Sequence, residues 1–337
     1  MKQAMKPPIP LILVLALTAG ACGPLQAPSA SLPTNTLTGA TRPSATPTRS
    51  PARTPIPSAS PSPQPLLPGE YIIAVQRDSE TAHSYSLIAL SPDGSIRQPI
   101  LDNVHSFSTV SPDFHLVASL DWEGRDLAIA SFLDSSRSSI PLPEPMYWAS
   151  WAPDGKRLLL SSPYHVLLVD RDSGDVTPVL DCSDSSIGQY FHCGQTQWSP
   201  NGAWVAIPMT LEMDGPPDPR NGIYIADASC LDSNGDCLAS AHGPYPDAIY
   251  TWSPSGDRLA ICEGYDLALV RVPGWGIKRG GNCGSVYSMA WSPDGQRIAL
   301  YIDGYIDLLD LHTGTVSAVT NDDLIEDVVS WINLPLP

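Results

Sequence analysis

With Cys22 set aside, six of the seven cysteines are the side chains in this sequence whose type and spacing point most directly to chemistry. They stand at Cys182, Cys193, Cys230, Cys237, Cys262 and Cys283. An even number of cysteines in a chain with an export signal indicates disulfide bonds. Their order along the chain favours the pairs Cys182 with Cys193, Cys230 with Cys237, and Cys262 with Cys283, although other pairings stay open.

A calcium loop is the second chemistry to consider. In LDSNGDC, residues 231–237, the side chains of Asp232, Asn234 and Asp236 alternate as calcium ligands do. The Gly that such a loop requires is replaced by Cys237, and no Glu follows at the twelfth position. We therefore interpret the segment as a turn inside a small disulfide loop, keep calcium as the alternative and expect no other cofactor.

Three further acidic residues and the histidines give no metal pattern. Asp303, Asp307 and Asp310 lie in YIDGYIDLLD, which has the alternation of a strand and a turn. The seven histidines are scattered at positions 83, 105, 115, 165, 192, 242 and 312. The sequence also lacks the Gly-x-Ser-x-Gly, His-Glu-x-x-His and glycine-rich phosphate motifs. We expect a protein that is not an enzyme.

The first 21 residues have the charged, apolar and small-residue order of an export signal. Lys2 and Lys6 precede the run PIPLILVLALTAG, which is short for a membrane span. The following TAGAC resembles a bacterial lipoprotein signal, in which cleavage leaves a lipid-bearing cysteine, here Cys22. Ala19 stands where such signals usually carry Leu. Cleavage by an ordinary signal peptidase is the alternative.

Residues 22–68 predict a disordered tether. Positions 23 to 68 contain twelve Pro and fourteen Ser or Thr but no acidic or aromatic residue. Such a composition cannot bury enough apolar surface to fold. Its prolines favour extended segments, with a reach of up to roughly 140 Å at about 3.1 Å per residue.

Negative charge begins where this tether ends. All 35 Asp and Glu lie from Glu70 onward with only 13 Lys and Arg, so residues 69–337 have a formal charge of 13 minus 35, or −22. This charge excludes nucleic acid and anionic membrane surfaces as direct partners, because both attract positive patches. Cations, basic proteins and neutral glycans remain.

A repeated motif organises residues 69–337. The copies are STVSPDFHLVASL, ASWAPDGKRLLLS, TQWSPNGAWVAIP, YTWSPSGDRLAIC and MAWSPDGQRIALY, and the fragment VVSWINLP follows near the end. The equivalent positions are Val110, Trp151, Trp198, Trp252, Trp291 and Trp331, at intervals of 41, 47, 54, 39 and 40 residues. These intervals fit a four-stranded propeller blade.

The motif itself is typical of a tight turn between strands. Pro presets one φ angle, Asp or Asn bonds to nearby backbone, and Gly accepts the positive φ that follows. We expect the tryptophans to pack between blades. A site lined by the repeated aspartates is the alternative.

On these copies, the chain resembles the TolB-like, WD-repeat-like β-propellers, whose repeats carry a Trp-Ser-Pro-Asp-Gly signature. Phe114 replaces Gly in the first copy, Ala152 replaces Ser in the second and Ser255 replaces Asp in the fourth, so irregular turns are expected there. The resemblance implies an all-β fold and a role in envelope assembly or transport.

The two ends of the repeat region predict six blades of four antiparallel strands. The last copy lacks strands after INLP, whereas YIIAVQ, YSLIAL and IRQPIL at the start lack an innermost strand. A C-terminal strand at 328–332 should therefore close the ring against the first strands. SPDG at 91–94 then belongs to an outer hairpin.

Strand direction places the irregular insertions at the end of the ring opposite the motif. Insertions on a rigid scaffold are where binding usually occurs. The binding candidates are Tyr190, His192, Asp214, Arg220 and Tyr245. Loops that only fill the space between blades are the alternative.

Together these features predict an exported monomer, tethered by an N-terminal lipid to the outer face of the bacterial cell membrane or held in the periplasm. We expect a non-catalytic binding or scaffold module for a protein or glycan of the cell envelope. The alternative is a propeller enzyme of hydrolase or lactonase type, with a central-channel site assembled from residues distant in sequence.

Overall fold

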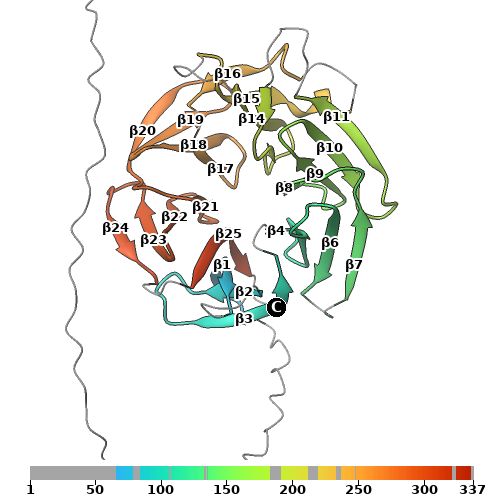
Figure 1. Cartoon of the computed structure of the whole chain (residues 1–337). Helices are drawn as coiled ribbons and strands as arrows, with labels where there is room; N and C mark the ends of the chain where they lie inside the picture. Colours follow the sequence, from blue (N-terminus) through green and yellow to red (C-terminus); the bar gives the residue numbers. More distant parts are fainter. Residues whose placement is uncertain are drawn as a thin grey trace, which may run out of the picture. The chain divides into compact units, whose positions relative to one another are not determined.

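The computed structural model describes residues 66–78, 84–105, 108–132, 134, 136–182, 191–211, 219–232, 237–246, 248–320 and 324–334. The predicted export signal, Cys22 and nearly all of the predicted tether lie outside these residues. The described part forms six antiparallel sheets around one axis (Figure 1). This is the predicted six-bladed β-propeller.

Each blade is a four-stranded meander, except the fourth, and the strands follow in order from the axis outward (Figure 1). Blade 1 contains β25 (Ile325–Leu334), β1 (Gly69–Arg77), β2 (Tyr85–Leu90) and β3 (Arg97–Val104). Blade 2 contains β4 (Ser108–Val110), β5 (Leu116–Leu120), β6 (Asp126–Ser131) and β7 (Arg137–Pro141). Blade 3 contains β8 (Trp148–Trp151), β9 (Arg157–Ser161), β10 (His165–Asp170) and β11 (Val176–Asp181).

The second half of the ring repeats this plan. Blade 4 contains β12 (Phe191–Cys193), β13 (Gln197–Trp198), β14 (Trp204–Leu211), β15 (Gly222–Asp227) and β16 (His242–Tyr245), with the 3₁₀ helix η2 (Ala228–Leu231) after β15. Blade 5 contains β17 (Ile249–Trp252), β18 (Arg258–Glu263), β19 (Asp266–Arg271) and β20 (Ile277–Asn282). Blade 6 contains β21 (Ser288–Trp291), β22 (Arg297–Ile302), β23 (Tyr305–Asp310) and β24 (Val316–Ala318).

Blade 4 departs from the four-strand pattern because its innermost position is split. β13 pairs with β14 at Gln197 and Trp198, whereas β12 pairs with the far end of the same strand, from Phe191 opposite Leu211 to Cys193 opposite Met209. β14 is long enough, at eight residues, to accept both partners. The insertion before β12 therefore adds a short fifth strand to this sheet.

The ring closes by pairing the two ends of the propeller. β25 runs antiparallel to β1, from Gly69 opposite Leu334 to Gln76 opposite Ile325. The ion pair from Arg77 Nε to Glu326 Oε1, at 2.9 Å, joins the same two strands. The predicted closing strand at 328–332 is thus confirmed and is longer than expected.

The hydrophobic core lies between blades. The described residues form six apolar clusters, and each one joins two neighbouring sheets. In one of them, Ala118 and Leu120 of blade 2 pack with Leu158, Leu160 and Trp151 of blade 3. Every blade is therefore apolar on both faces, as a sheet buried between two others must be.

The motif tryptophans occupy these interfaces, as predicted. Trp151, Trp198, Trp252, Trp291 and Trp331 are all buried. Trp291 of blade 6 donates from Nε1 to the Thr251 carbonyl of blade 5, at 3.2 Å. The guanidinium of Arg258, also on blade 5, lies 5.1 Å from the same indole ring. A cation stacked on a ring at this distance adds to the attraction between the two blades.

Arginines of the motif repeat this contact elsewhere in the ring. Arg157 of blade 3 covers Trp198 of blade 4 at 5.1 Å, and Arg297 of blade 6 covers Trp331 of blade 1 at 4.9 Å. These three motifs therefore turn their own chain and also cover the tryptophan of the next blade.

The expected irregular turns keep their shape through local substitutes. Phe114 adopts φ +57° in the place of the usual Gly and still donates its backbone N–H to the Ser111 carbonyl at 2.9 Å. Where Ser255 stands in place of Asp, Asp257 accepts from the hydroxyl groups of Ser253 and Ser255 instead.

A half-buried carboxyl lies on the closing strand. Asp327 of β25 is next to Ser288 of β21, and desolvation raises the pKa of its carboxyl to about 7, against the hydrogen bonds from Ser288 and from the backbone of Val328. The charged form of Asp327 is therefore disfavoured at the junction of blades 6 and 1.

Replacing Trp291 with Ala should lower the free energy of unfolding by about 3 to 5 kcal/mol, because it leaves a cavity between blades 5 and 6. Urea unfolding followed by fluorescence or circular dichroism measures this loss. The matched control is Trp122→Ala, since that indole is 85% exposed and its removal opens no cavity. Equal stability of Trp291→Ala and the parent chain would contradict the placement.

Asp327→Asn should change how stability depends on pH. The folded-state pKa of about 7 exceeds the ordinary value of 3.8, so the stability that this carboxyl contributes is fully present below about pH 4 and is lost as pH rises through 7. Asn cannot ionise, so between about pH 5 and pH 8 the variant should gain at least about 1 kcal/mol relative to the parent chain. Urea unfolding at both pH values tests this, with the exposed Asp303→Asn as control. Parallel pH profiles for Asp327→Asn and the parent would refute the shift.

Candidate functional site

The ring of blades has two ends that differ in their connections. First-to-second and third-to-fourth strand turns share one end, which we call the motif end. Second-to-third turns and the links between blades share the other, which we call the insertion end. A binding site on the loops must use one of these two ends.

Polar groups at the motif end are already used in building the turns. Ser292 donates to Asp294 at 2.5 Å and accepts from the Arg297 backbone N–H at 2.8 Å, while Gly295 N–H bonds to the Ser292 carbonyl. The outer hairpin of blade 1 uses Ser91 and Asp93 in the same way. The repeated aspartates therefore act as turn residues, as expected.

These bonds change the acidity of the turn carboxylates. The pKa of Asp93 falls to about 2 because its carboxylate accepts from the Ser91 hydroxyl and then from the backbone and hydroxyl of Ser95. The pKa of Asp257 is lowered chiefly by the Ser255 hydroxyl. Carboxylates held in this way stay ionised and are poorly suited to proton transfer near neutral pH.

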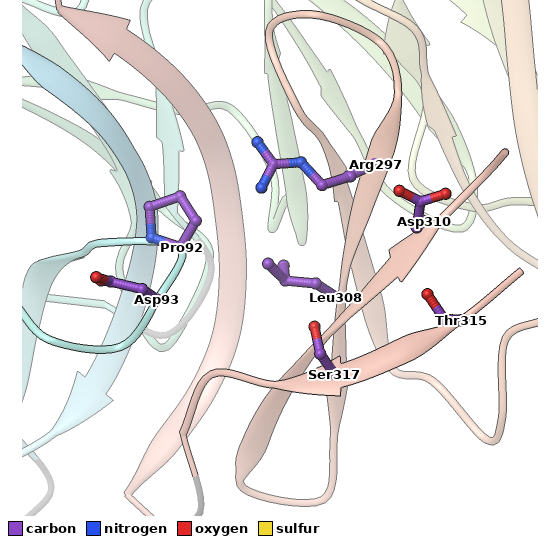
Figure 2. A pocket seen from close by; sticks show the side chains of 7 residues that line it. All are labelled: Pro92, Asp93, Arg297, Leu308, Asp310, Thr315 and Ser317. Carbon is purple, nitrogen blue, oxygen red and sulfur yellow. The ribbon is translucent and has the colours of Figure 1, made fainter. Parts of the chain in front are cut away.

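A hollow of about 320 Å³ lies at the junction of blades 6 and 1 (Figure 2). Its charged side chains already have ion-pair or hydrogen-bond partners. Arg297 Nη2 lies 3.0 Å from each carboxylate oxygen of Glu70. Asp310 accepts the backbone N–H of Thr313 at 2.7 Å and its hydroxyl at 2.8 Å. Figure 2 shows Asp93 and Asp310 on opposite sides of Arg297. The hollow is a seam between blades rather than a reactive site.

The innermost strands carry few groups for chemistry. Of their described residues only Glu326 and Asp327 are carboxylates, both on β25, and Glu326 pairs with Arg77. In the described ranges, no group of three His, Cys, Asp or Glu is placed to hold a metal ion. The same ranges contain no helix with the length and hydropathy to cross a bilayer.

The calcium hypothesis falls mostly outside the described residues. Asn234 and Asp236 are not described, whereas Asp232 lies 2.9 Å from the Arg157 guanidinium of blade 3. Asp303 and Asp310 lie just before and at the end of β23, the alternating strand and turn expected there. The LDSNGDC segment thus touches the neighbouring blade through an ion pair.

Three of the five predicted binding residues can be placed, and they lie at the insertion end of blade 4. His192 is opposite Thr210, Arg220 lies just before β15, and Tyr245 is opposite Ile223 at the start of β15. Tyr190 and Asp214 lie outside the described residues. The register therefore gathers His192, Arg220 and Tyr245 at one end of one sheet.

These three residues differ in how available they are. Tyr245 packs against the cluster between blades 4 and 5, and burial raises the pKa of its phenol. The backbone carbonyl of Arg220 accepts from the Tyr224 hydroxyl at 2.8 Å. His192 is half-buried and contacts the edge of Tyr164, with ring centroids 5.6 Å apart. Tyr245 thus contributes to packing. His192 instead contacts Tyr164, which is exposed.

Disulfide bonds hold the loops near these residues. The structure pairs Cys182 with Cys193, Cys230 with Cys237 and Cys262 with Cys283, which is the pairing expected from sequence order. The first and third bonds lie at the insertion end, and the second lies at the motif end after β15. Disulfides are typical of extracytoplasmic proteins. Bonds at the insertion end limit the entropy that its loops lose on binding.

Exposed aromatic side chains are the functional candidates that the sequence analysis missed. In the described part of the chain, five Trp and Tyr side chains are exposed, and all lie in second-to-third turns or links between blades: Trp122, Tyr147, Tyr164, Tyr265 and Tyr287. The exposed apolar residues Ile96, Ile277 and Val316 lie at the motif end instead. The sequence could have indicated these candidates, because Trp and Tyr stand in predicted turns where polar residues are usual.

Four aromatic side chains at the insertion end form what we call the aromatic ridge: Trp122, Tyr147, Tyr164 and His192. Backbone bonds join their loops in sequence. Met146 N–H bonds to the Gly124 carbonyl at 2.8 Å, and Tyr147 N–H bonds to the Ser161 carbonyl at 3.0 Å. Cys182 and Cys193 then donate to the carbonyls of Tyr164 and Pro163. Loops from blades 2, 3 and 4 are thereby fixed side by side.

Comparison with protein families gives one partial match. Residues 250–332, which are less than half of the chain, match the family described as the anaphase-promoting complex subunit 4 WD40 domain. A search of curated proteins finds no match.

Solved structures resemble the chain in fold at low sequence identity. TolB from Acinetobacter baumannii is 18% identical with a TM-score of 0.53, and the alignment covers 78% of this chain and 66% of TolB, just under two thirds. A chain of a nidogen/laminin complex is 9% identical, with a TM-score of 0.57 and coverage of 78% and 97%. A candidate 6-phosphogluconolactonase from Bacteroides uniformis is 11% identical, with a TM-score of 0.50 and coverage of 78% and 99%.

Identities this low establish architecture and leave activity open. The turn motif, the six sheets, the WD40 match and the likeness to TolB agree with one another. The chain is a six-bladed β-propeller with TolB-like, WD-repeat-like architecture.

Proposed function

We propose that this protein is an exported, lipid-tethered binding module that recognises a protein or glycan of the cell envelope with the insertion end of its propeller. The observation that carries the proposal is the distribution of exposed Trp and Tyr side chains. All five in the described chain lie at the insertion end, on loops fixed by backbone bonds and disulfides. Exposed Trp and Tyr are the residues that most often dominate binding energy at interfaces.

Features of the sequence support the cellular part of the proposal. The leader resembles a lipoprotein signal with Cys22 as the acylated residue, and the Pro-rich segment to residue 68 supplies reach. Three disulfides suit an oxidising compartment outside the cytoplasm. A propeller held in this way can stand clear of the membrane and present its insertion end.

A binding role is favoured over catalysis by the residues around the axis. The described innermost strands offer Asp327 as the carboxylate without an ion pair, and one such group does not make a hydrolytic site. The motif end offers carboxylates tied into turns. We therefore assign the protein a non-catalytic role.

The experiment uses the full chain expressed in a bacterial host. Cells are fed an alkyne-bearing fatty acid, and the protein should become labelled, whereas Cys22→Ala should lose the label and leave the membrane fraction. In the same strain, a photoreactive p-benzoylphenylalanine replaces either Tyr147 at the insertion end or Ile277 at the motif end, two exposed positions. Tyr147 should cross-link to an envelope component, and Ile277 should not.

Each readout addresses one part of the proposal. Absence of the fatty-acid label on the parent chain would reject the lipid tether but would leave the proposed binding role unaffected. Equal cross-linking from Tyr147 and Ile277 would show that the insertion end is not the binding surface. Discrete cross-links from Ile277 alone would move the site to the motif end.

A further inference from the structure

We propose that the aromatic ridge docks a segment of a partner protein that is rich in Lys and Arg. This inference deepens the proposed function and rests on it, because it names the surface and the chemistry of the partner. The occupant is a cationic polypeptide, recognised by the faces of the rings together with neighbouring carboxylates.

The ridge exposes aromatic rings to solvent. Trp122 is 85% exposed and Tyr164 is 52% exposed, although both stand in short turns of otherwise polar character. Exposed Trp and Tyr side chains offer a partner large apolar surfaces together with a polar group. Trp and Tyr faces attract ammonium and guanidinium groups through their quadrupole, and Trp does so best.

The ridge is ordered before any partner arrives. The turn of Trp122 is bonded to the Tyr147 loop through Gly124 and Met146, and the Tyr164 turn is bonded to both cysteines of the Cys182–Cys193 disulfide. Gly124 is buried and has φ +69°, and a Cβ there would lie 2.2 Å from the Met146 carbonyl oxygen. Little loop entropy is therefore lost on docking.

Charge around the ridge selects a cationic occupant. Asp121 and the exposed Glu123 flank Trp122, and the exposed Arg125 ends the same turn. Glu144 lies in the Tyr147 loop, 2.7 Å from His165, so carboxylates outnumber the arginine in these two loops. Both lysines of the described chain, Lys156 and Lys278, lie at the motif end. Residues 69–337 have a formal charge of −22, so the field of the whole propeller also attracts cations.

A neutral glycan fits this surface less well. Sugar rings can stack on aromatic faces and their hydroxyls can donate to carboxylates, but a neutral sugar gains no attraction from the net negative charge of the propeller. An acidic partner would be repelled. The combination of rings and carboxylates therefore favours Lys and Arg side chains.

The test measures binding to the purified full chain in a polyoxyethylene detergent, which carries no sugar. The probes are a fluorescein-labelled peptide of alternating Arg, Ser and Lys, the same peptide with Glu at the charged positions, and a labelled chito-oligosaccharide. Fluorescence anisotropy gives the affinity of each. Only the basic peptide should bind, and its affinity should fall as NaCl rises from about 50 mM to about 300 mM, since surface charges become screened.

Variants distinguish binding at the aromatic ridge from nonspecific attraction of the basic peptide to a negatively charged protein. Trp122→Ala and Tyr164→Ala leave the net charge of the protein unchanged. Each should raise the Kd for the basic peptide about three- to ten-fold. Tyr265→Ala removes an aromatic ring that is 64% exposed at the insertion end of blade 5, outside the ridge, and should leave binding of the basic peptide unchanged. Blade 5 lies across the propeller from blade 2 (Figure 1). Ile277→Ala is the control at the motif end. Unchanged melting curves confirm that each variant is folded.

The outcomes are distinct. Basic-peptide binding that is insensitive to Trp122→Ala and Tyr164→Ala, or equally sensitive to Tyr265→Ala, would overturn the ridge as the site. Binding of the oligosaccharide alone would replace the occupant with a glycan. If no probe binds while Tyr147 still cross-links in cells, the inference is wrong and the proposed function stands. If no probe binds and Tyr147 does not cross-link in cells, both the inference and the proposed function are rejected.

Discussion

The structure depends on closure of a ring in which every sheet is apolar on both faces. Six clusters join neighbouring blades, so an open ring would leave two faces in water, one on each side of the gap. Closure is achieved by β25, which adds the innermost strand to blade 1 and brings Trp331 into the interface with blade 6. The last strand in sequence thereby completes the core of the first blade.

The closed ring also places the residues that build the motif turns at one end and the exposed Trp and Tyr side chains at the other. At the motif end, serines, aspartates and arginines are bonded to their own turns or lie over the tryptophan of the next blade, as Arg297 does with Glu70 and Trp331. At the insertion end, the same sheets leave Trp122, Tyr147 and Tyr164 uncovered. A rigid ring lets these loops vary without loss of the core, which is why binding on propellers can differ while the architecture is shared.

The repeat tolerates departures because several local bonds specify each turn. Phe114 accepts the left-handed conformation, Asp257 replaces the missing carboxylate at Ser255, and the Ala152 turn keeps its bond from Gly155 N–H to the Ala152 carbonyl at 3.0 Å. Losing one partner leaves the reversal of the chain intact.

Local sequence by itself determined the blades, their number and the closing strand, because turn chemistry and the alternation of strands act between near neighbours. It also placed His192, Arg220 and Tyr245 at one end. The order of the cysteines favoured the observed pairs but left other pairings open. Only the tertiary structure decided that Arg258 covers Trp291, that β12 and β13 share the innermost place of blade 4, and that the pKa of Asp327 rises. It alone joined Trp122, Tyr147 and Tyr164 into one ridge. Such contacts unite segments from different blades, and solvent exposure depends on what every other blade covers.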